Sequence, residues 1–304
     1  MESTLINLST ELAEIVRTLD LHIVSVRARR HYPSSGVRWS PGVVVTSDHA
    51  IQREEDITIT MADGKTVGAT LVGRDPGTDL AILKMQSSGS SANQIGRAEG
   101  VKAGELTLVV GRSPDSGVNA SLGIVSATSG PWRTWRGGQL DAYIRLDAKL
   151  FPQSSGGAVV NVRGEIIGIA TSALSRIAGV AIPVSTVQSV AEKLLQRGFV
   201  PRGYLGIAVQ QVGFSEELRK KLSVPNRSGL IVLSVEPGGP ADKAGILIGD
   251  IVTSIGDALI EQTDDLQTYS DSGVIGKSVK INYVRGGVLS HSALTVGERP
   301  GRRS

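Results

Sequence analysis

The chain has 304 residues, no cysteine and a formal net charge of +3. Without cysteine it can form no disulfide, no thiolate metal site and no thiol nucleophile. Its 32 basic residues outnumber the 29 acidic ones by too little to indicate a nucleic-acid partner. An apolar fraction of 40% supports ordinary cores, and the length fits two globular domains.

The N-terminal segment has neither the apolar stretch nor the cleavage site of a signal peptide. Acidic residues interrupt each candidate stretch, and no run in the chain reaches the ~20 apolar residues that span a bilayer. We therefore expect no membrane span and, for the sequence as written, a cytoplasmic protein. A protein whose leader had been removed would read the same way and would be periplasmic.

An amphipathic helix is predicted over residues 9–19. Ser9 can cap its N-terminus, and acidic side chains follow near the positive end of the helix dipole. Four apolar positions recur at helical spacing and share one face. They are Leu12, Ile15, Val16 and Leu19.

Short β-branched segments separated by Gly, Pro, Ser and Asp follow this helix. Such regular short strands with turn signals predict a mostly β domain, a sandwich or a barrel. The expected strands are residues 21–26, 42–46, 56–61, 69–72, 80–85, 106–110, 159–162, 165–171 and 179–182.

A domain boundary is predicted near residues 198–203. Ser185 can cap a helix with apolar residues at helical spacing, Gly198 ends it, and Pro201 follows. We divide the chain into an N-terminal helical segment (1–20), a first domain (21–198), a second domain (199–297) and a disordered basic tail (298–304). The second domain is expected to contain strands at 205–210, 230–235, 251–255 and 278–283 and short helices at 240–244 and 263–270.

Three residues at strand edges suggest nucleophilic catalysis. His49 follows one apolar strand, Asp79 precedes another, and Ser155 lies in a Gly-rich loop between strands. A serine hydroxyl needs a base within hydrogen-bond reach, and that base needs a carboxylate to fix its tautomer. The order His, Asp, Ser is the chymotrypsin order of this triad. Each residue alone is more often an ordinary loop residue, so the joint order carries the inference.

The sequence around these residues resembles the HtrA (Deg) family of trypsin-fold proteases. The resemblance lies in residues 46–50 (Thr-Ser-Asp-His-Ala), 75–81 (Asp-Pro-Gly-Thr-Asp-Leu-Ala) and 146–157, which ends Gln-Ser-Ser-Gly-Gly. It implies a chymotrypsin-like double β-barrel with the triad between the barrels. It also implies an oxyanion hole from the backbone N–H groups of Gln153 and Ser155, and a substrate pocket lined by Leu150 and Leu174.

Gln153 departs from the family pattern, which has glycine at this position. Glutamine still supplies an N–H group but lacks the freedom of glycine to adopt positive φ. We therefore expect a slow resting enzyme whose oxyanion hole is completed when substrate or another ligand stabilises the loop.

The C-terminal part resembles a PDZ domain, a partly open β-barrel with two short helices. Residues 202–207 (Arg-Gly-Tyr-Leu-Gly-Ile) match the carboxylate-binding loop and the first strand of the peptide groove. Successive backbone N–H groups can bind a terminal carboxylate, and the peptide adds as a strand. The resemblance thus implies a peptide site. Its expected residues are Arg202, Tyr204, Leu205, Gly206 and Ile207.

The expected function is an HtrA-like serine endopeptidase that cleaves unfolded or damaged proteins. Its PDZ domain would bind peptide C-termini or apolar segments. The resemblance implies a homotrimer or larger homo-oligomer, and no cofactor or metal is expected. The alternative is a weakly active or inactive protease fold that serves as a peptide-binding, chaperone-like scaffold. Gln153 motivates this alternative, and the complete triad argues against it.

Overall fold

The structure is a computed structural model that describes residues 4–30, 32–86, 100–270 and 272–299. The chain separates into two compact units, residues 1–200 and 201–304. Each unit has its own hydrophobic core and is described by itself. No helix in the described ranges is long and apolar enough to cross a membrane.

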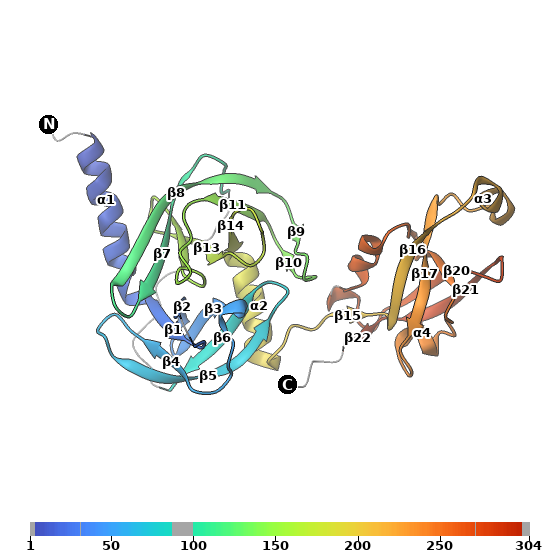
Figure 1. Cartoon of the computed structure of the whole chain (residues 1–304), viewed down its shortest axis with the longest axis horizontal. Coiled ribbons are helices and arrows are strands. Elements are labelled where there is room, and N and C mark those ends of the chain that lie inside the picture. The colour runs from blue at the N-terminus through green and yellow to red at the C-terminus, as the bar shows by residue number, and fades with distance from the viewer. Residues whose placement is uncertain (1–3, 31, 87–99, 271, 300–304) are drawn as a thin grey trace. The chain divides into compact units, whose positions relative to one another are not determined.

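The first unit contains two closed antiparallel β-barrels of six strands each (Figure 1). The predicted double barrel is thereby confirmed. The first barrel has the order β1 (Ile23–Arg27), β2 (Ser34–Ser40), β3 (Val43–Ser47), β6 (Leu80–Met85), β5 (Thr66–Asp75), β4 (Ile57–Thr60). The second has the order β11 (Tyr143–Asp147), β14 (Gly179–Pro183), β13 (Ile166–Thr171), β12 (Ala158–Asn161), β7 (Leu106–Ser113), β8 (Gly117–Ser129). A small sheet pairs β9 (Trp132–Arg133) with β10 (Gln139–Leu140).

The sequences of β3 and β6 are continuous apolar runs because both faces of each strand are buried. Alternate side chains of each strand point to opposite faces of a sheet. Val44 and Leu83 fill the interior of the first barrel, whereas Val45 and Ile82 belong to the core between the two barrels. By contrast β4, with one buried face, alternates buried isoleucines with half-exposed threonines.

Helix α2 (Val184–Arg197) packs its apolar face into the core between the barrels. It begins after Pro183, so the expected cap Ser185 lies within its first turn. The proline fixes φ just before the helix and so sets its start. At the other end Gly198 has φ +77° and donates its N–H to Leu194 O at 2.8 Å, as the sequence predicts.

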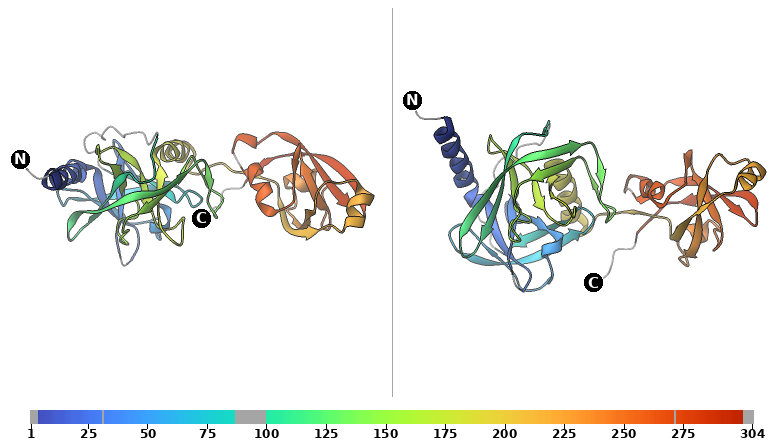
Figure 2. Two further views of the ribbon diagram at one scale, coloured as in Figure 1. Left: turned by 90° about the horizontal axis from the view of Figure 1, so that it is seen from above. Right: turned by 45° about the horizontal axis from the view of Figure 1, so that its top comes forward.

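Helix α1 (Thr4–Leu19) begins at Thr4 rather than at Ser9. Its predicted apolar face is confirmed, since Leu12, Ile15 and Val16 pack against the core between the barrels. Figures 1 and 2 show the other end of α1 projecting away from the barrels, with Leu5 75% exposed. Local helix propensity extends the helix beyond the part that tertiary packing buries.

The second unit is built on an antiparallel sheet in the order β16-β17-β18-β20-β21, with β19 paired to β18. A two-stranded sheet of β15 and β22 lies beside it in the same unit. The strands are β15 (Gly203–Tyr204), β16 (Ile207–Gly213), β17 (Ser228–Val235), β18 (Ile251–Ile255), β19 (Ala258–Leu259), β20 (Ser278–Arg285), β21 (Val288–Thr295) and β22 (Gly297–Glu298). The helices are α3 (Glu216–Leu222), α4 (Pro240–Lys243) and the 3₁₀ helices η3 (Thr263–Ser270) and η4 (Ser272–Val274).

The ordered part of this unit extends past residue 297, where we expected a disordered tail to begin. Glu298 pairs with Gly203, and Arg299 donates its N–H to Arg202 O at 2.8 Å. These backbone bonds hold the end of the unit in a short sheet. Residues 300–304 of the expected tail lie outside the described residues.

The first unit should fold without the second, because its barrels and α2 close around their own cores. We expect residues 1–200 alone to give a soluble monomer or oligomer with a β-type far-UV spectrum and one cooperative thermal transition. Circular dichroism and calorimetry on the truncated chain measure this. A truncated chain without near-UV signal or cooperative unfolding would show that residues 201–304 complete its core.

Candidate active site

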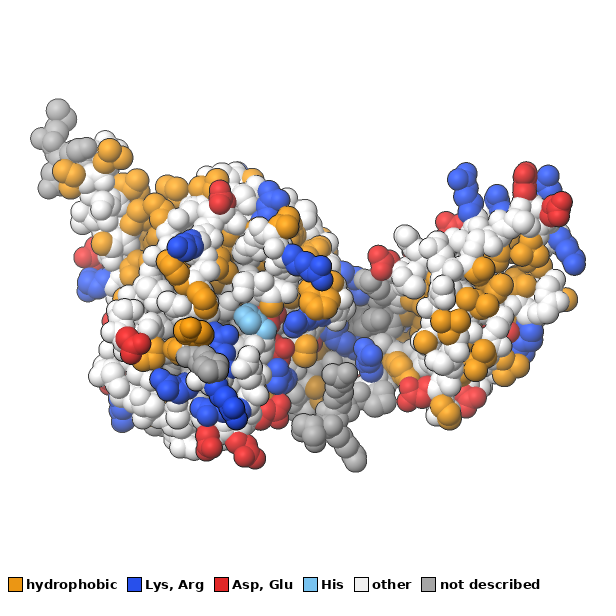
Figure 3. Space-filling view, viewed as in Figure 1, with side chains coloured by type: hydrophobic (Ala, Val, Ile, Leu, Met, Phe, Trp, Pro, Cys, Tyr) orange, Lys and Arg blue, Asp and Glu red, His pale blue; other side chains and the backbone are white. Residues whose placement is uncertain are grey.

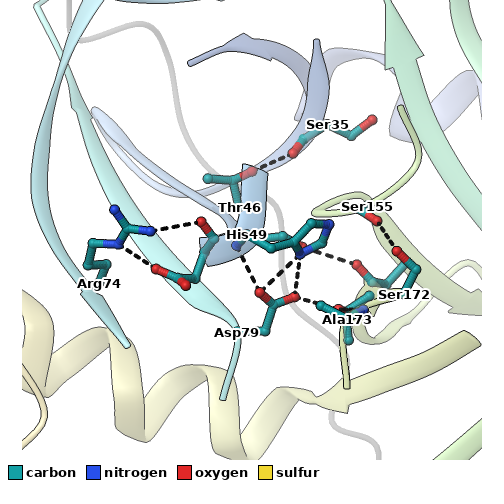
Figure 4. Close-up of polar contacts among 12 residues, drawn as sticks. Ser35, Thr46, His49, Arg74, Asp79, Ser155, Ser172 and Ala173 are labelled. Atoms are coloured by element: carbon teal, nitrogen blue, oxygen red, sulfur yellow. Dashed lines mark hydrogen bonds and ion pairs between the residues drawn. The ribbon is translucent and has the colours of Figure 1, made fainter. Parts of the chain in front are cut away.

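His49 is presented by a 3₁₀ turn, η2 (Asp48–Ala50), directly after β3. Its ring Nδ1 lies 2.8 Å from Asp79 Oδ2 and 3.0 Å from Oδ1 (Figure 4). The backbone N–H of His49 donates to Asp79 Oδ1 at 2.9 Å. The Asp79 side chain is fully buried, whereas His49 is 22% exposed. The carboxylate therefore fixes both the ring and its backbone.

Asp79 itself adopts the left-handed region, with φ +59°. Non-glycine residues rarely do so, and Asp and Asn tolerate it best. The preceding turn prepares this conformation, since the Asp75 carboxylate accepts Thr78 N at 3.1 Å and Thr78 Oγ1 at 2.7 Å. Strain of this kind is retained where the surrounding structure imposes it and often marks a functional site.

Thr171, in β13 of the second barrel, also donates its hydroxyl to Asp79 Oδ2. The Thr171 oxygen in turn accepts the Ala173 N–H at 3.0 Å. Each oxygen of the buried carboxylate thus receives hydrogen bonds, which compensate for its desolvation. A carboxylate beside Nδ1 favours the His49 tautomer in which Nδ1 carries the proton and Nε2 does not.

A second buried carboxylate, Asp48, lies beside His49 in the chain. Arg74 Nε binds Asp48 Oδ1 at 2.5 Å, and Arg74 Nη2 binds Asp48 O at 3.2 Å. Burial raises the pKa of the Asp48 carboxyl, and the hydrogen bond and charge of Arg74 oppose that rise. Arg74 therefore keeps a buried negative charge beside the site paired.

Ser155 lies in the loop that precedes β12, on the second barrel. Gly156 follows it with φ +84°, and a Cβ on Gly156 would lie 2.2 Å from Ser35 O and 2.6 Å from Thr46 Oγ1. This position therefore requires glycine for both conformation and space. Gly156 N–H donates to Ala170 O at 2.8 Å, which anchors the loop on β13.

The Ser155 hydroxyl is bonded to Ser172 Oγ at 3.3 Å (Figure 4). The hydrogen bonds of the described residues include none between Ser155 and His49, although we expected Ser155 Oγ to approach His49 Nε2. The structure thus brings His49 and Asp79 together and gives the hydroxyl of the expected nucleophile, Ser155, another partner.

Ser35, in β2 of the first barrel, forms hydrogen bonds with two residues of the loop that contains Ser155. Its N–H donates to Ser155 O at 3.0 Å, and its hydroxyl donates to Gln153 O at 2.6 Å. The same hydroxyl accepts the N–H of Arg112 in β7 at 2.9 Å. Ser35 is fully buried, so these bonds are shielded from water.

Gln153 occupies the third position of a β-turn closed by Ser154 N–H to Phe151 O at 2.8 Å. Three non-glycine residues have positive φ in the described part of the chain, and Gln153 is not among them. A turn with proline second and negative φ at the third position is of type I. Gln153 therefore does not take the left-handed conformation that glycine would favour here.

The expected peptide site lies in the second unit, around Gly206, which has φ +78°. Leu205 O accepts Ala241 N–H and Gly206 O accepts Glu236 N–H, each at 2.9 Å. The N–H groups of Leu205 and Gly206 have no acceptor among the described residues. Tyr204 donates its hydroxyl to the Glu236 carboxylate, and Ile207 begins β16, which is an edge of the sheet. The Arg202 carbonyl is engaged by Arg299.

Comparison with known protein families matches both units. Residues 34–169 match the trypsin-like peptidase domain, and residues 203–296 match the PDZ domain. A probable periplasmic serine endoprotease, DegP-like, from Ectopseudomonas mendocina (strain ymp) is 30% identical over 264 residues, which are 85% of this chain and 55% of that protein. A DegP-like protein from Brucella suis biovar 1 (strain 1330) is 34% identical over 232 residues, 74% of this chain and 44% of that protein.

Solved structures agree with these matches. The HtrA-type protease AlgW with decapeptide has a TM-score of 0.74 and 27% identity, covering 95% of this chain and 99% of that one. The serine endoprotease from Yersinia pestis has a TM-score of 0.74 and 29% identity, covering 95% and 98%. This chain belongs to the HtrA family. It spans about half the length of the curated relatives that it matches.

The leucines expected to line the substrate pocket of this HtrA protein differ in exposure. Leu150 is half-buried, and its side chain occupies the space where a Cβ on Gly179 would lie. Leu174 is 2% exposed and belongs to the core between the barrels. Its side chain offers a substrate little surface in this conformation, so the pocket assignment stays a prediction.

Three further histidines occur in the sequence. His22 is buried, with burial and the charge of Arg38 lowering its pKa. His291 lies on an exposed position of β21 in the second unit, and His31 lies outside the described residues. Neither described histidine has the buried carboxylate partner that distinguishes His49.

Sequence reasoning missed Ser35, Thr171 and Ser172. Ser35 and Gln153 are 118 residues apart, and Thr171 and Asp79 are 92 apart, so no local motif links the partners. The one available signal is that Thr171 and Ser172 are small hydroxyl residues at the end of a predicted strand, residues 165–171, whereas Ser35 lies in β2, which the pattern does not predict.

Replacing Asp79 with Asn should separate positioning from folding. Asn tolerates left-handed φ as Asp does, so we expect a folded protein with nearly unchanged thermal stability. Its amide N–H would favour the wrong His49 tautomer, and kcat should fall on the order of 10⁴-fold. Steady-state kinetics on a peptide substrate measure this. A Asp79→Asn enzyme within tenfold of the wild type would contradict the assigned role.

Proposed function

We propose that this HtrA protein is a serine endopeptidase that cleaves unfolded or damaged proteins. The buried Asp79 carboxylate bonded to the His49 ring is the observation that carries the proposal. Such a pair activates a neighbouring hydroxyl, and Ser155 is the serine that the sequence pattern and the nucleophile loop supply. Named relatives that are DegP-like serine endoproteases support the same reaction.

In the proposed mechanism the Ser155 hydroxyl turns from Ser172 to His49 when substrate binds. His49 Nε2 then takes the hydroxyl proton as Ser155 Oγ attacks the scissile carbonyl, and later gives it to the leaving amine. Asp79 holds the ring and stabilises the imidazolium. Thr171 keeps the carboxylate in place and thus acts through Asp79.

The oxyanion hole is proposed to consist of the backbone N–H groups of Gln153 and Ser155. Such preorganised donors stabilise the charge that develops on the carbonyl oxygen, and losing one typically lowers turnover by about 10²–10³-fold. Because Gln153 lies in a type I turn, we place the resting enzyme in a state with one donor turned away. Glycine at this position, as in the family pattern, would relieve the steric cost of the alternative turn.

The second unit is proposed to bind peptide C-termini or exposed apolar segments. Edge strand β16 can accept an added strand, and the unpaired N–H groups of Leu205 and Gly206 can bind a carboxylate. The solved HtrA-type protease AlgW with decapeptide supports peptide recognition by such proteins. If Leu150 and Leu174 line the primary pocket, cleavage follows small or medium aliphatic residues.

The location is proposed from the names of the relatives, and the assembly from the exposed apolar end of α1. Several are named as periplasmic proteases, so we propose a periplasmic location for this protein and abandon the cytoplasmic expectation, which the relatives do not support. A homotrimer or larger assembly is proposed with α1 near the interface, since Leu5 and Ile6 expose apolar surface.

On the face in Figure 3, acidic and basic side chains are interspersed over each unit.

Labelling with a serine-directed fluorophosphonate tests the endopeptidase proposal. We expect labelling of the full chain that disappears in Ser155→Ala and falls strongly in His49→Ala. Ser34→Ala is a matched control, because Ser34 is a buried serine of β2 outside the proposed mechanism. Equal labelling of wild type and Ser155→Ala would reject Ser155 as nucleophile and favour a peptide-binding scaffold without protease chemistry.

Terminal-carboxylate capture predicts that an aliphatic-ended peptide binds better as the free acid than as its C-terminal amide. The charge is worth roughly 1.5–3 kcal/mol in hydrogen bonds to N–H donors, so we expect about a tenfold or larger difference in Kd. Isothermal calorimetry with both peptides measures it. Equal affinities would point to internal apolar segments as the ligands.

A further inference from the structure

Arg29 connects the first barrel to the nucleophile loop through backbone carbonyls. It lies in the connection between β1 and β2, is half-buried, and donates Nη2 to Pro152 O at 3.0 Å. The same guanidinium donates Nη2 to Pro33 O at 3.3 Å and Nε to Tyr32 O. The planar guanidinium group of arginine can donate to several acceptors at once. The carbonyls of Tyr32 and Pro33 therefore hold the guanidinium that donates to Pro152 O.

The carbonyl that Arg29 holds belongs to the peptide that also contains the Gln153 N–H. A trans peptide is planar, and its C=O and N–H point in opposite directions. An interaction that fixes Pro152 O therefore also fixes the direction of the N–H that is proposed as an oxyanion donor. Arg29 reaches this peptide from the other barrel, 123 residues away in sequence.

The Pro152–Gln153 peptide can take two orientations within the Phe151–Ser154 turn. Types I and II share the closing bond, here Ser154 N–H to Phe151 O, and differ by turning over the central peptide. Type II also requires positive φ at the third residue, which Gln153 lacks. The type I turn is thus favoured by the hydrogen bond from Arg29 to Pro152 O, and also because residue 153 is not glycine.

We propose that Arg29 is a positioning residue that holds the Pro152–Gln153 peptide in the type I turn, with the Gln153 N–H directed away from the oxyanion. When Arg29 releases Pro152 O, the peptide turns over and the N–H groups of Gln153 and Ser155 act together. Ser35 keeps Gln153 O and Ser155 O fixed on either side, so the change is confined to one peptide. This inference rests on the proposed endopeptidase function.

The test compares Arg29→Ala, Arg29→Lys and the wild-type full chain in steady-state kinetics on one peptide. Loss of one hydrogen bond of average strength should raise kcat by about threefold to tenfold, with KM changed less than about twofold. Lysine can donate to one carbonyl but lacks the fork, so Arg29→Lys should lie between the two. Arg53→Ala is the matched control, because Arg53 also donates to a backbone carbonyl of this barrel, Arg27 O, away from the loop.

A merely structural role for Arg29 predicts a different result. Arg29→Ala would then lower thermal stability, and its kcat at temperatures where the variant is folded would be unchanged or lower than that of the wild type. Either of these two kinetic results overturns the inference. A crystal structure of Arg29→Ala gives a readout without activity. We expect positive φ at Gln153 in that variant, and a retained type I turn would also overturn the inference.

Failure of the proposed function would look different. If fluorophosphonate fails to label both wild type and Gln153→Gly, there is no competent nucleophile, and the endopeptidase proposal fails together with this inference. If labelling depends on Ser155 and Gln153→Gly raises its rate while Arg29→Ala does not, the endopeptidase proposal stands and the role of Arg29 is refuted.

Discussion

The hydrogen bonds of Ser35 link the two barrels beside Ser155. His49 and Asp79 belong to the first barrel and Ser155 to the second, so the positions of the three residues relative to one another depend on how the barrels meet. Ser35 binds Ser155 O and Gln153 O and accepts the Arg112 N–H, while Thr46 Oγ1 binds Ser35 O at 2.7 Å. These short links join the strand before His49 to the loop that carries Ser155. Gly156 fits into the same contact because it lacks a side chain.

Three buried carboxylates, Asp48, Asp75 and Asp79, lie near His49, and each has a different set of hydrogen-bond donors. Asp79 is satisfied by His49 and Thr171, and Asp75 by the N–H and hydroxyl groups of its own turn. Asp48 depends on Arg74, a cation from β5. Buried carboxylates that share a small region disfavour one another's ionisation unless each has donors of its own. Each of the three carboxylates therefore has hydrogen-bond donors of its own, which compensate for its burial.

The sequence predicts those parts of the site that lie in contiguous motifs. His49, Asp79 and Ser155 each stand in a short pattern at a strand edge, and alternation or apolar runs predict most strands that carry them. Ser35, Thr171 and Arg29 escape prediction because their partners are distant in sequence and are brought near by barrel closure. The side-chain rotation of Ser155 toward Ser172 depends on local hydrogen-bond competition, which no pattern of residue types encodes. Strands β2, β8 and β11 were missed because they are half-exposed or rich in Ser and Gly.

The division of the proposed triad between the barrels also sets the order in which its residues are synthesised. His49 and Asp79 lie in the first barrel, whose last strand ends at Met85, so both are synthesised before the second barrel. Thr171 and Ser155 arrive later, and α2 packs between the barrels only after both exist. Under the proposed mechanism, a chain that ends before Ser155 has the proposed base but not the proposed nucleophile, and it therefore cannot cleave itself or its neighbours.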